Sequence, residues 1–312
     1  DMYMRIATEL PLKRLIVGGM DRVYEVGRIF RNEGMDPKHN PEFTTVEMYQ
    51  AYADFHDMMD IAEGILSGAA KAIHGTYTLE WLGETIDLTP GWRRLTMVDA
   101  VREYVGIDFG TITDDAEAVA AAKAKGVELA PAAEKTWGNA LYACFDQKVE
   151  EKLIQPTFIT MYPVEVSPLT KRSPADPRLT ERFELFICHS ELANAYSELN
   201  DPLDQRERFV KQAEQRQRGD DETEMMDEDF LTAIEYGLPG RDNTIISRLV
   251  QSPCRLSGST ERNQQPYRYQ QILHKGLLYL TDLYRTEKRD KERYRKIDQY
   301  PVEDRNKYQI LS

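Results

Sequence analysis

The sequence has few cysteines, few histidines and no long apolar run. Its 312 residues include three cysteines, at positions 144, 188 and 254, and five histidines, without a CxxC pair. A structural zinc site needs several Cys or His ligands at short spacing, so we expect reduced cysteines without a metal role. No stretch of about 18 uncharged apolar residues occurs, and the first residues lack the apolar region of a signal peptide. These absences argue against a membrane or secreted protein and predict a cytoplasmic one.

Basic residues are also in deficit. The chain has 40 Lys plus Arg against 53 Asp plus Glu, a formal net charge of −13. This balance argues against a nucleic-acid footprint over the whole chain, although one local basic face stays open. The basic run at 285–298 also contains acidic residues, so a solvated helix face is favoured over an RNA-binding one. Hydrophobic residues make up 41% of the chain, enough for a large core.

The order of the predicted elements favours an α+β fold with an antiparallel sheet. The predicted elements are a helix ending near residue 19, strands at 22–31 and 42–49, a helix at 57–73, helices at 114–126 and 137–153, strands at 157–162, 182–188 and 191–198, and helices at 202–218 and 228–236. The mainly helical middle, about 96–153, is predicted to be an insertion. Periodicity weakens beyond residue 239, so we predict one domain at 1–239 and an atypical segment at 240–312.

The most informative motif is FRNEG at 30–34, followed by HNPEF at 39–43. Arg31 offers a planar fork suited to a carboxylate or a phosphate. Strand parity places Phe43, Glu47 and Tyr49 on one face. A flat base could stack on the ring of Phe43, and an ammonium group could bind to the carboxylate of Glu47 and the phenol of Tyr49. The alternative is that Arg31 pairs with Glu33 on the surface and Phe43 belongs to the core.

Three segments in the same order carry a family resemblance. Residues 3–59, which include FRNEG and HNPEFT, closely resemble the catalytic core of class II lysyl-tRNA synthetases, where this pair is the second signature motif. The segments LIQPTFITMYPVEVSPLTKR at 153–172 and LTERFELFICHSELANAYSELNDPLDQRERF at 179–209 support it. The resemblance covers about residues 1–239. It implies a class II synthetase-like antiparallel sheet flanked by helices.

The resemblance implies a role for each matching residue. Arg31 would be the catalytic residue, holding the lysine carboxylate and the α-phosphate of ATP. The implied ATP-binding residues besides Arg31 are Glu33, His39, Asn40, Phe43 and Asn194. The implied lysine-binding residues are Glu9, Glu47, Tyr49, Asn194, Tyr196 and Glu198. Glu184 and Glu191 would bind Mg²⁺ against the ATP phosphates. The implied reaction activates L-lysine as an adenylate and transfers it to tRNA(Lys), and the full-length family protein would be a homodimer.

Strand geometry tests part of this site. If His189 and Ser190 form a tight turn, Glu184 pairs near Ala195 and Cys188 near Glu191, so Glu184 and Glu191 share a face. Strict alternation would place Asn194, Tyr196 and Glu198 on the other face. A β-bulge between Glu191 and Asn194 is therefore predicted.

The sequence also departs from the family. The first signature motif and the anticodon-binding domain have no match here, so we expect a catalytic-core fragment. The Gly-rich third motif should follow AIEYGLPG at 233–240, but RDNTIISRLVQSP stands there, and Arg248 is the one candidate for the ATP-contacting arginine of that motif. Three functions stay open: a lysyl-tRNA synthetase core, a paralogue that lysylates a protein, and an inactive lysine-binding module. Residues 240–312 are a genuine tail, a fusion or a frameshift product.

Overall fold

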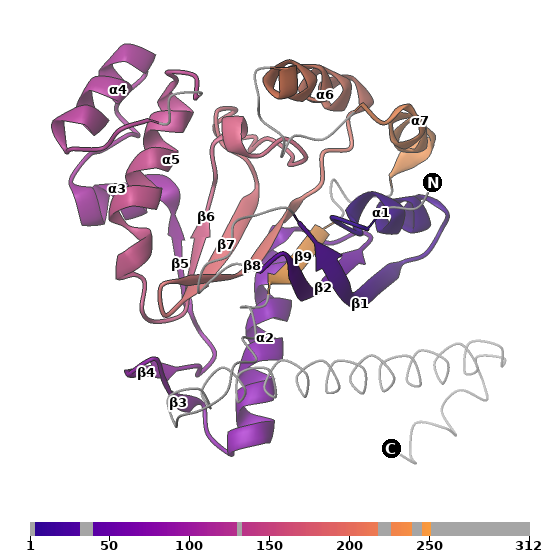
Figure 1. Cartoon of the computed structure of the whole chain (residues 1–312), viewed down its shortest axis with the longest axis horizontal. Coiled ribbons are helices and arrows are strands. Elements are labelled where there is room, and N and C mark those ends of the chain that lie inside the picture. Colours follow the sequence, from indigo (N-terminus) through magenta and orange to yellow (C-terminus); the bar gives the residue numbers. More distant parts are fainter. Residues whose placement is uncertain (1–3, 32–39, 130–132, 218–225, 239–244, 251–312) are drawn as a thin grey trace, which may run out of the picture.

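The computed structural model describes residues 4–31, 40–129, 133–217, 226–238 and 245–250, with 214–217 and 245–250 described by their backbone only. Its main feature is a seven-stranded sheet with the order β1-β2-β9-β8-β7-β6-β5 (Figure 1). The strands are β1 (Arg22–Phe30), β2 (Glu42–Gln50), β5 (Arg93–Thr96), β6 (Thr157–Thr160), β7 (Arg182–Ile187), β8 (Ser190–Ser197) and β9 (Ile245–Val250). All neighbouring pairs are antiparallel except β5 and β6, which are parallel. A separate hairpin consists of β3 (Thr78–Trp81) and β4 (Glu84–Asp87).

Helices cover the sheet in three groups (Figure 1). The long helix α2 (Phe55–His74) packs on β7, β8 and β9. Helix α1 (Glu9–Val17) packs on β1 and β2 at one end of the sheet and on α7 (Glu228–Gly237), which also contacts α6 (Pro202–Gln217). Helices α3 (Met97–Val105), α4 (Asp115–Ala124) and α5 (Trp137–Lys148), with the short 3-10 turns η1 (Glu150–Lys152) and η2 (Val164–Val166), lie at the β5 end.

The two faces of strand β2 have different chemistry because its side chains alternate. Val46 and Met48 belong to the apolar core under α2. Glu47 and Tyr49 are also buried, but Tyr49 packs with Leu12 and Ile16 of α1 on the other face. The strand therefore directs apolar side chains toward α2 and polar ones toward the α1 side, which is where a site can form.

Local signals fix the ends of α2. The Asp54 side chain accepts hydrogen bonds from the backbone N–H groups of His56 and Asp57, and the Asp57 carboxylate accepts one from the Asp54 N–H. This reciprocal arrangement satisfies backbone donors at the start of the helix. The helix ends at Gly75, whose φ of 70° suits a residue without a Cβ.

Most predicted elements are found within a few residues of their expected bounds. The helices and sheets are compatible with the α+β class, but the parallel pair of β5 and β6 makes the main sheet mixed instead of purely antiparallel. The elements that were missed are the strands β3, β4 and β5, the helix α3, the short turn η2 and the strand β9. Of the missed strands, β3, β4 and β5 are the shortest. Each of these strands has only four residues, too few for alternation to show. The region 96–153 does contain α3, α4 and α5, but its status as an insertion stays a prediction.

Strand β9 lies beyond the predicted domain boundary at residue 239. It pairs with β2 on one side and with β8 on the other, in the interior of the sheet. Sequence patterns did not predict this strand, because its position depends on partner strands far away in the chain. The division at 239 stays a prediction, and the other residues of the 240–312 segment lie outside the described parts of the chain.

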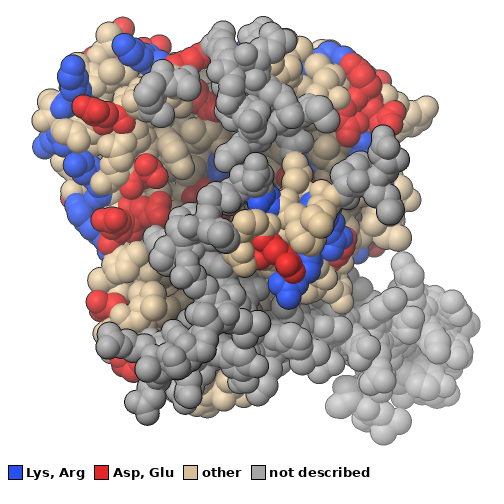
Figure 2. All heavy atoms as spheres, in the orientation of Figure 1, with Lys and Arg blue, Asp and Glu red and all other residues tan. Residues whose placement is uncertain are grey.

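The surface agrees with the excess of acidic residues. In the view of Figure 2, basic and acidic side chains are interspersed over α3, α4 and α5, and acidic side chains gather over the α6 side. A broad basic area is not seen on the described part of this face. The described helices include none with the length and apolar character needed to cross a membrane.

Candidate active site

Polar side chains converge on the face of the sheet opposite α2. Strand β2 contributes Glu47 and Tyr49, and strand β8 contributes Asn194 and Tyr196, with Glu198 just after it. Glu47 and Glu198 are 3% and 1% exposed, and Tyr49 is 1% exposed. Buried carboxylates are rare unless a partner compensates their charge. This face is therefore the candidate active site.

The segment before α1 joins the strands of this site. The backbone carbonyl of Ile6 accepts a hydrogen bond from Arg31 Nε at 3.3 Å. Two residues later, Thr8 Oγ1 donates to Glu47 Oε2 at 2.6 Å, and Tyr196 Oη donates to Glu9 Oε1 at 2.8 Å. One short stretch of chain thus contacts residues from the end of β1, from β2 and from β8.

Arg31 and Phe43 form the second part of the site. The guanidinium carbon of Arg31 lies 5.7 Å from the ring centre of Phe43, within the range of a cation–π contact. Asn40 is half-buried two residues before β2. Glu33 and His39 lie outside the described residues, so their predicted roles in ATP binding stay predictions.

A residue that the sequence did not indicate, Lys13, lies in the middle of the polar cluster. Its Nζ is 2.6 Å from Glu9 Oε1 and 2.6 Å from Glu198 Oε2, and its side chain is fully buried. The signal that could have revealed it is local. Lys13 lies on the buried stripe of α1 with Leu12 and Ile16, four residues after Glu9, where a charged side chain needs a buried partner.

Two buried acceptors of the cluster remain without a hydrogen-bond partner in the part of the chain that the structure describes. They are Glu198 Oε1 and Tyr49 Oη. Leaving such groups unsatisfied costs about 1–3 kcal/mol each, so they point to a ligand that donates hydrogen bonds. Burial raises the pKa of the Glu198 carboxyl to about 8, with Lys13 lowering it and Glu9 raising it. Burial, together with the charges of Glu9 and Glu47, also raises the pKa of Tyr49.

The β7–β8 hairpin contains the predicted bulge. Leu185 pairs with Ala193 and Phe186 pairs with Glu191, which leaves Leu192 as the extra residue. This shift places Glu191 on the same face as Glu184 and Asn194, which are directly paired. The bulge prediction is confirmed, and with it the common face of the five predicted residues on and just after this hairpin.

The predicted turn was wrong by one residue. Its central residues are Cys188 and His189, with φ values of 51° and 63°, and not His189 and Ser190. Positive φ at both positions matches the twist of a two-residue hairpin. As a result Glu184 pairs with Asn194 instead of Ala195, and Phe186 instead of Cys188 pairs with Glu191.

The predicted metal ligands lie beside an arginine. Glu184 accepts hydrogen bonds from Arg182 and Asn194 on one oxygen and from Tyr162 on the other, while Glu191 is exposed. Burial raises the pKa of Tyr142, and the charges of Glu184 and Glu191 add to this effect, so both carboxylates lie near that phenol. Within the described ranges, no group of three or more His, Cys, Asp or Glu side chains could hold a metal ion by itself.

Arg248 is described by its backbone. The register of β9 places it opposite Glu47 of β2 on one side and opposite Asn194 of β8 on the other. Arg248 was predicted only because it is the one arginine near the position expected for the third motif. Its backbone lies between Glu47 and Asn194, two residues of the site.

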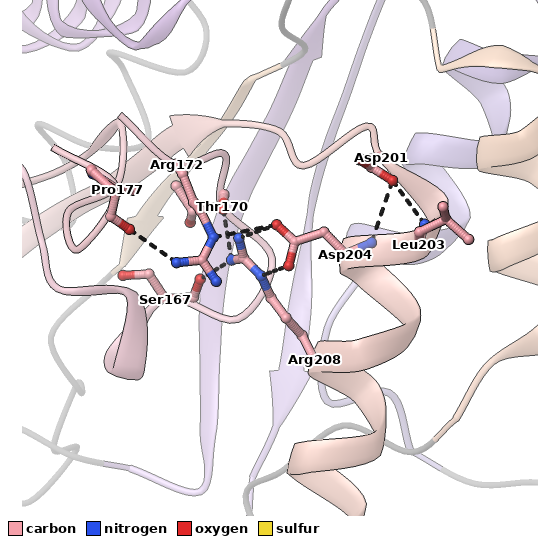
Figure 3. Close-up of polar contacts among 8 residues, drawn as sticks. All are labelled: Ser167, Thr170, Arg172, Pro177, Asp201, Leu203, Asp204 and Arg208. Carbon is pink, nitrogen blue, oxygen red and sulfur yellow. Dashed lines mark hydrogen bonds and ion pairs between the residues drawn. The ribbon is translucent and has the colours of Figure 1, made fainter. Parts of the chain in front are cut away.

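A buried arginine fastens the loop that follows η2 to helix α6 (Figure 3). Arg208 donates to the carbonyls of Ser167 and Thr170 at 2.9 and 2.7 Å and to both carboxylate oxygens of Asp204 at 3.0 and 2.9 Å. Arg172, in the loop, lies 3.5 Å from the same carboxylate. This contact holds the loop in place. Ser167 also accepts a hydrogen bond from Arg182, and Thr170 pairs with Glu198 of the polar cluster.

We expect Arg208→Met to lower the free energy of unfolding by roughly 3 kcal/mol, because two buried carbonyls and a carboxylate lose their donor. Urea denaturation measures this value. Arg206→Met on the same helix is the control, because Arg206 makes an exposed pair with Glu228 and should change stability little. Equal effects of the two substitutions would contradict a structural role for Arg208.

Comparisons with known proteins show the family of this chain. A profile of the family described as tRNA synthetases class II (D, K and N) matches residues 1–241. The lysine--tRNA ligase of Thermoanaerobacter sp. (strain X514) is 55% identical over 239 residues, which are 77% of this chain and 48% of that protein. Lysine--tRNA ligases of Clostridium botulinum (strain Hall) and Listeria monocytogenes serovar 1/2a are each 56% identical, with the same coverage. The chain spans about half the length of these relatives, and it belongs to the class II tRNA synthetase family of the D, K and N group.

Proposed function

We propose that this chain carries the catalytic site of an enzyme that activates L-lysine with ATP and transfers the lysyl group to tRNA(Lys). The observation that carries the proposal is the pair of buried oxygens without a described partner, Glu198 Oε1 and Tyr49 Oη, in a cluster rich in carboxylates. A carboxylate in such a place recovers its desolvation cost when an ammonium group donates to it. The relatives named lysine--tRNA ligases support the same substrate.

In this proposal the amino acid lies along the site face. Its ε-ammonium group donates to Glu198 and Tyr49, and its aliphatic stem lies on Tyr196. Its α-ammonium group meets Glu9, whose Oε1 already accepts a hydrogen bond from Tyr196. Glu47, held by Thr8, adds negative charge beside Tyr49. A pocket of carboxylates would repel aspartate, the substrate of a related branch of the family.

ATP lies at the Arg31 end. The adenine stacks on Phe43, and Arg31 binds the lysine carboxylate together with the α-phosphate. A lysine carboxylate oxygen then attacks the α-phosphorus, pyrophosphate leaves, and the guanidinium stabilises the negative charge that develops. Glu33, His39, Asn40 and Asn194 complete the nucleotide site, and Arg248 replaces the arginine of the third motif. A tRNA hydroxyl then attacks the lysyl carbonyl of the adenylate, the acyl–phosphate bond breaks and AMP leaves, without a covalent enzyme intermediate.

A magnesium ion fits the remaining carboxylates. Glu184 and Glu191 share one face of the hairpin and offer the hard oxygen ligands that Mg²⁺ prefers. Two protein carboxylates are few for a closed metal site, but they suit an ion that keeps water and phosphate oxygens as its other ligands. When bound, Mg²⁺ would neutralise charge on the ATP phosphates.

For the whole protein we further propose a cytoplasmic homodimer.

Lysine-dependent exchange of pyrophosphate into ATP tests the proposal. We expect exchange with L-lysine, and at least about tenfold less with norleucine, which has the same stem but no ε-ammonium group. Transfer to tRNA and to protein acceptors is then measured separately. Exchange without transfer to tRNA would favour a protein-lysylating enzyme, and lysine binding without exchange would favour an inactive module. Absence of lysine binding would overturn the proposed substrate.

A further inference from the structure

The polar cluster of the candidate site contains a cation of its own. Lys13 Nζ lies between Glu9 and Glu198, at 2.6 Å from one oxygen of each, and 5.8 and 5.5 Å from the ring centres of Tyr196 and Phe230. Glu9 and Glu198 are the carboxylates that the proposed function assigns to the two ammonium groups of the substrate. An internal ammonium group therefore bridges the two ends of the expected ligand.

The bridge is a fixed part of the pocket. Lys13 is completely buried, and removing one partner of a buried ion pair leaves an uncompensated charge. Burial by itself lowers the pKa of Lys13, but the charges of Glu198 and Glu9 outweigh it, so the pKa is raised and the side chain stays charged. A substrate has to bind beside this cation and does not replace it.

We propose that Lys13 is a positioning residue that sets the charge of the pocket for an amino acid with two ammonium groups. The inference rests on the proposed function and deepens it. Glu9, Glu47 and Glu198 bring three carboxylates to the cluster, and Lys13 offsets one of these charges. Once an ammonium ligand has displaced the proton of Glu198, two negative charges remain for two ammonium groups.

Lys13 also orients Glu198. It contacts Oε2, while Oε1 of the same carboxylate has no partner among the residues with described side chains. The free oxygen and Tyr49 Oη thus form a receptor of fixed direction. Without the ammonium group on Oε2, the carboxylate would be free to rotate and would face Glu9 without a cation between them. Both effects weaken the binding of an ε-ammonium group.

The test replaces Lys13 with methionine in the 312-residue chain and measures binding of L-lysine and of ATP by calorimetry between pH 6 and pH 9. The titratable groups that the neighbouring elements bring to the cluster around Glu198 are Glu9 and Lys13 of α1, Glu47 and Tyr49 of β2 and Tyr196 of β8. Loss of the cation makes ionisation of Glu198 harder. We expect the Lys13→Met variant to bind lysine about tenfold or more weakly than the unaltered chain at pH 7.5. Its lysine affinity should reach a plateau at a higher pH than that of the unaltered chain.

Three controls separate this role from a structural one. Arg14→Met removes the next cation of α1, which pairs with Asp227 outside the cluster, and should leave the pH profile unchanged. ATP affinity should stay within about twofold of its original value in both variants. If Lys13→Met does not fold, Lys13→Gln takes its place, because its amide can still donate hydrogen bonds but carries no charge.

The outcomes are distinct. Unchanged lysine affinity and pH profile in a folded Lys13 variant would overturn the inference while leaving the proposed function intact. Equal losses of lysine and ATP affinity would also overturn it, because they would indicate general damage to the site. If the unaltered chain binds no lysine, both the proposed function and the inference fail.

Discussion

Replacing Arg31 with alanine is expected to lower kcat/KM for lysine-dependent ATP–pyrophosphate exchange by about 10³-fold. The guanidinium lies at the end of the site where Phe43 offers a surface for the base. In the proposed reaction it binds both reacting groups, and the charge that it stabilises grows in the transition state. A smaller donor cannot replace its planar fork, so Arg31→Lys should recover little of the loss.

The control for Arg31 lies on β1, the strand that ends just before it. Arg28 forms an exposed pair with Glu42 at 3.5 Å, and both side chains are more than half exposed, at 61% and 53%. Arg28→Ala should therefore change exchange by less than about twofold. If Arg31→Ala raised KM for ATP but left kcat unchanged, Arg31 would be a binding residue without a role in the transition state.

Replacing Glu198 with glutamine should weaken lysine binding by about 10²-fold or more at pH 8, because the amide keeps the shape but loses the charge-assisted hydrogen bond. It should also remove a pH dependence. The pKa of Glu198 is raised to about 8 by burial, so below that pH the carboxyl holds a proton that lysine has to displace. In the unaltered chain, lysine affinity is expected to rise by up to about tenfold per unit between pH 6 and 8 and then level off.

Glu228→Gln provides the matched substitution for Glu198. Glu228 lies on α7, near the pocket, but its side chain is 62% exposed and pairs with Arg206. This variant should bind lysine like the unaltered chain and keep the rise in affinity with pH. If the affinity of Glu198→Gln for lysine still rose with pH, another group would be responsible for the titration. If this variant bound lysine normally, Glu198 would not be a lysine-binding residue.

Several parts of the site could be predicted because they depend on short-range patterns. Alternation along β2 placed Glu47 and Tyr49 together, and they share a face. Counting along β8 showed that Glu191 and Asn194 could share a face only with a bulge, and Leu192 forms it. The turn was misplaced by one residue, because a bulge and a shifted turn compensate each other in the sequence pattern.

The sequence by itself determined the strand faces, the helices with clear periodicity, the family, and the residue types suited to a cationic amino acid and a nucleotide. Only the tertiary structure decided that Lys13 bridges Glu9 and Glu198, and that β9 lies between β2 and β8. The reason is physical. Alternation and helical period are set by neighbouring residues, so they can be read from the sequence. The position of a buried charge and the partners of a strand depend on groups up to about two hundred positions away, which come together only when the chain folds.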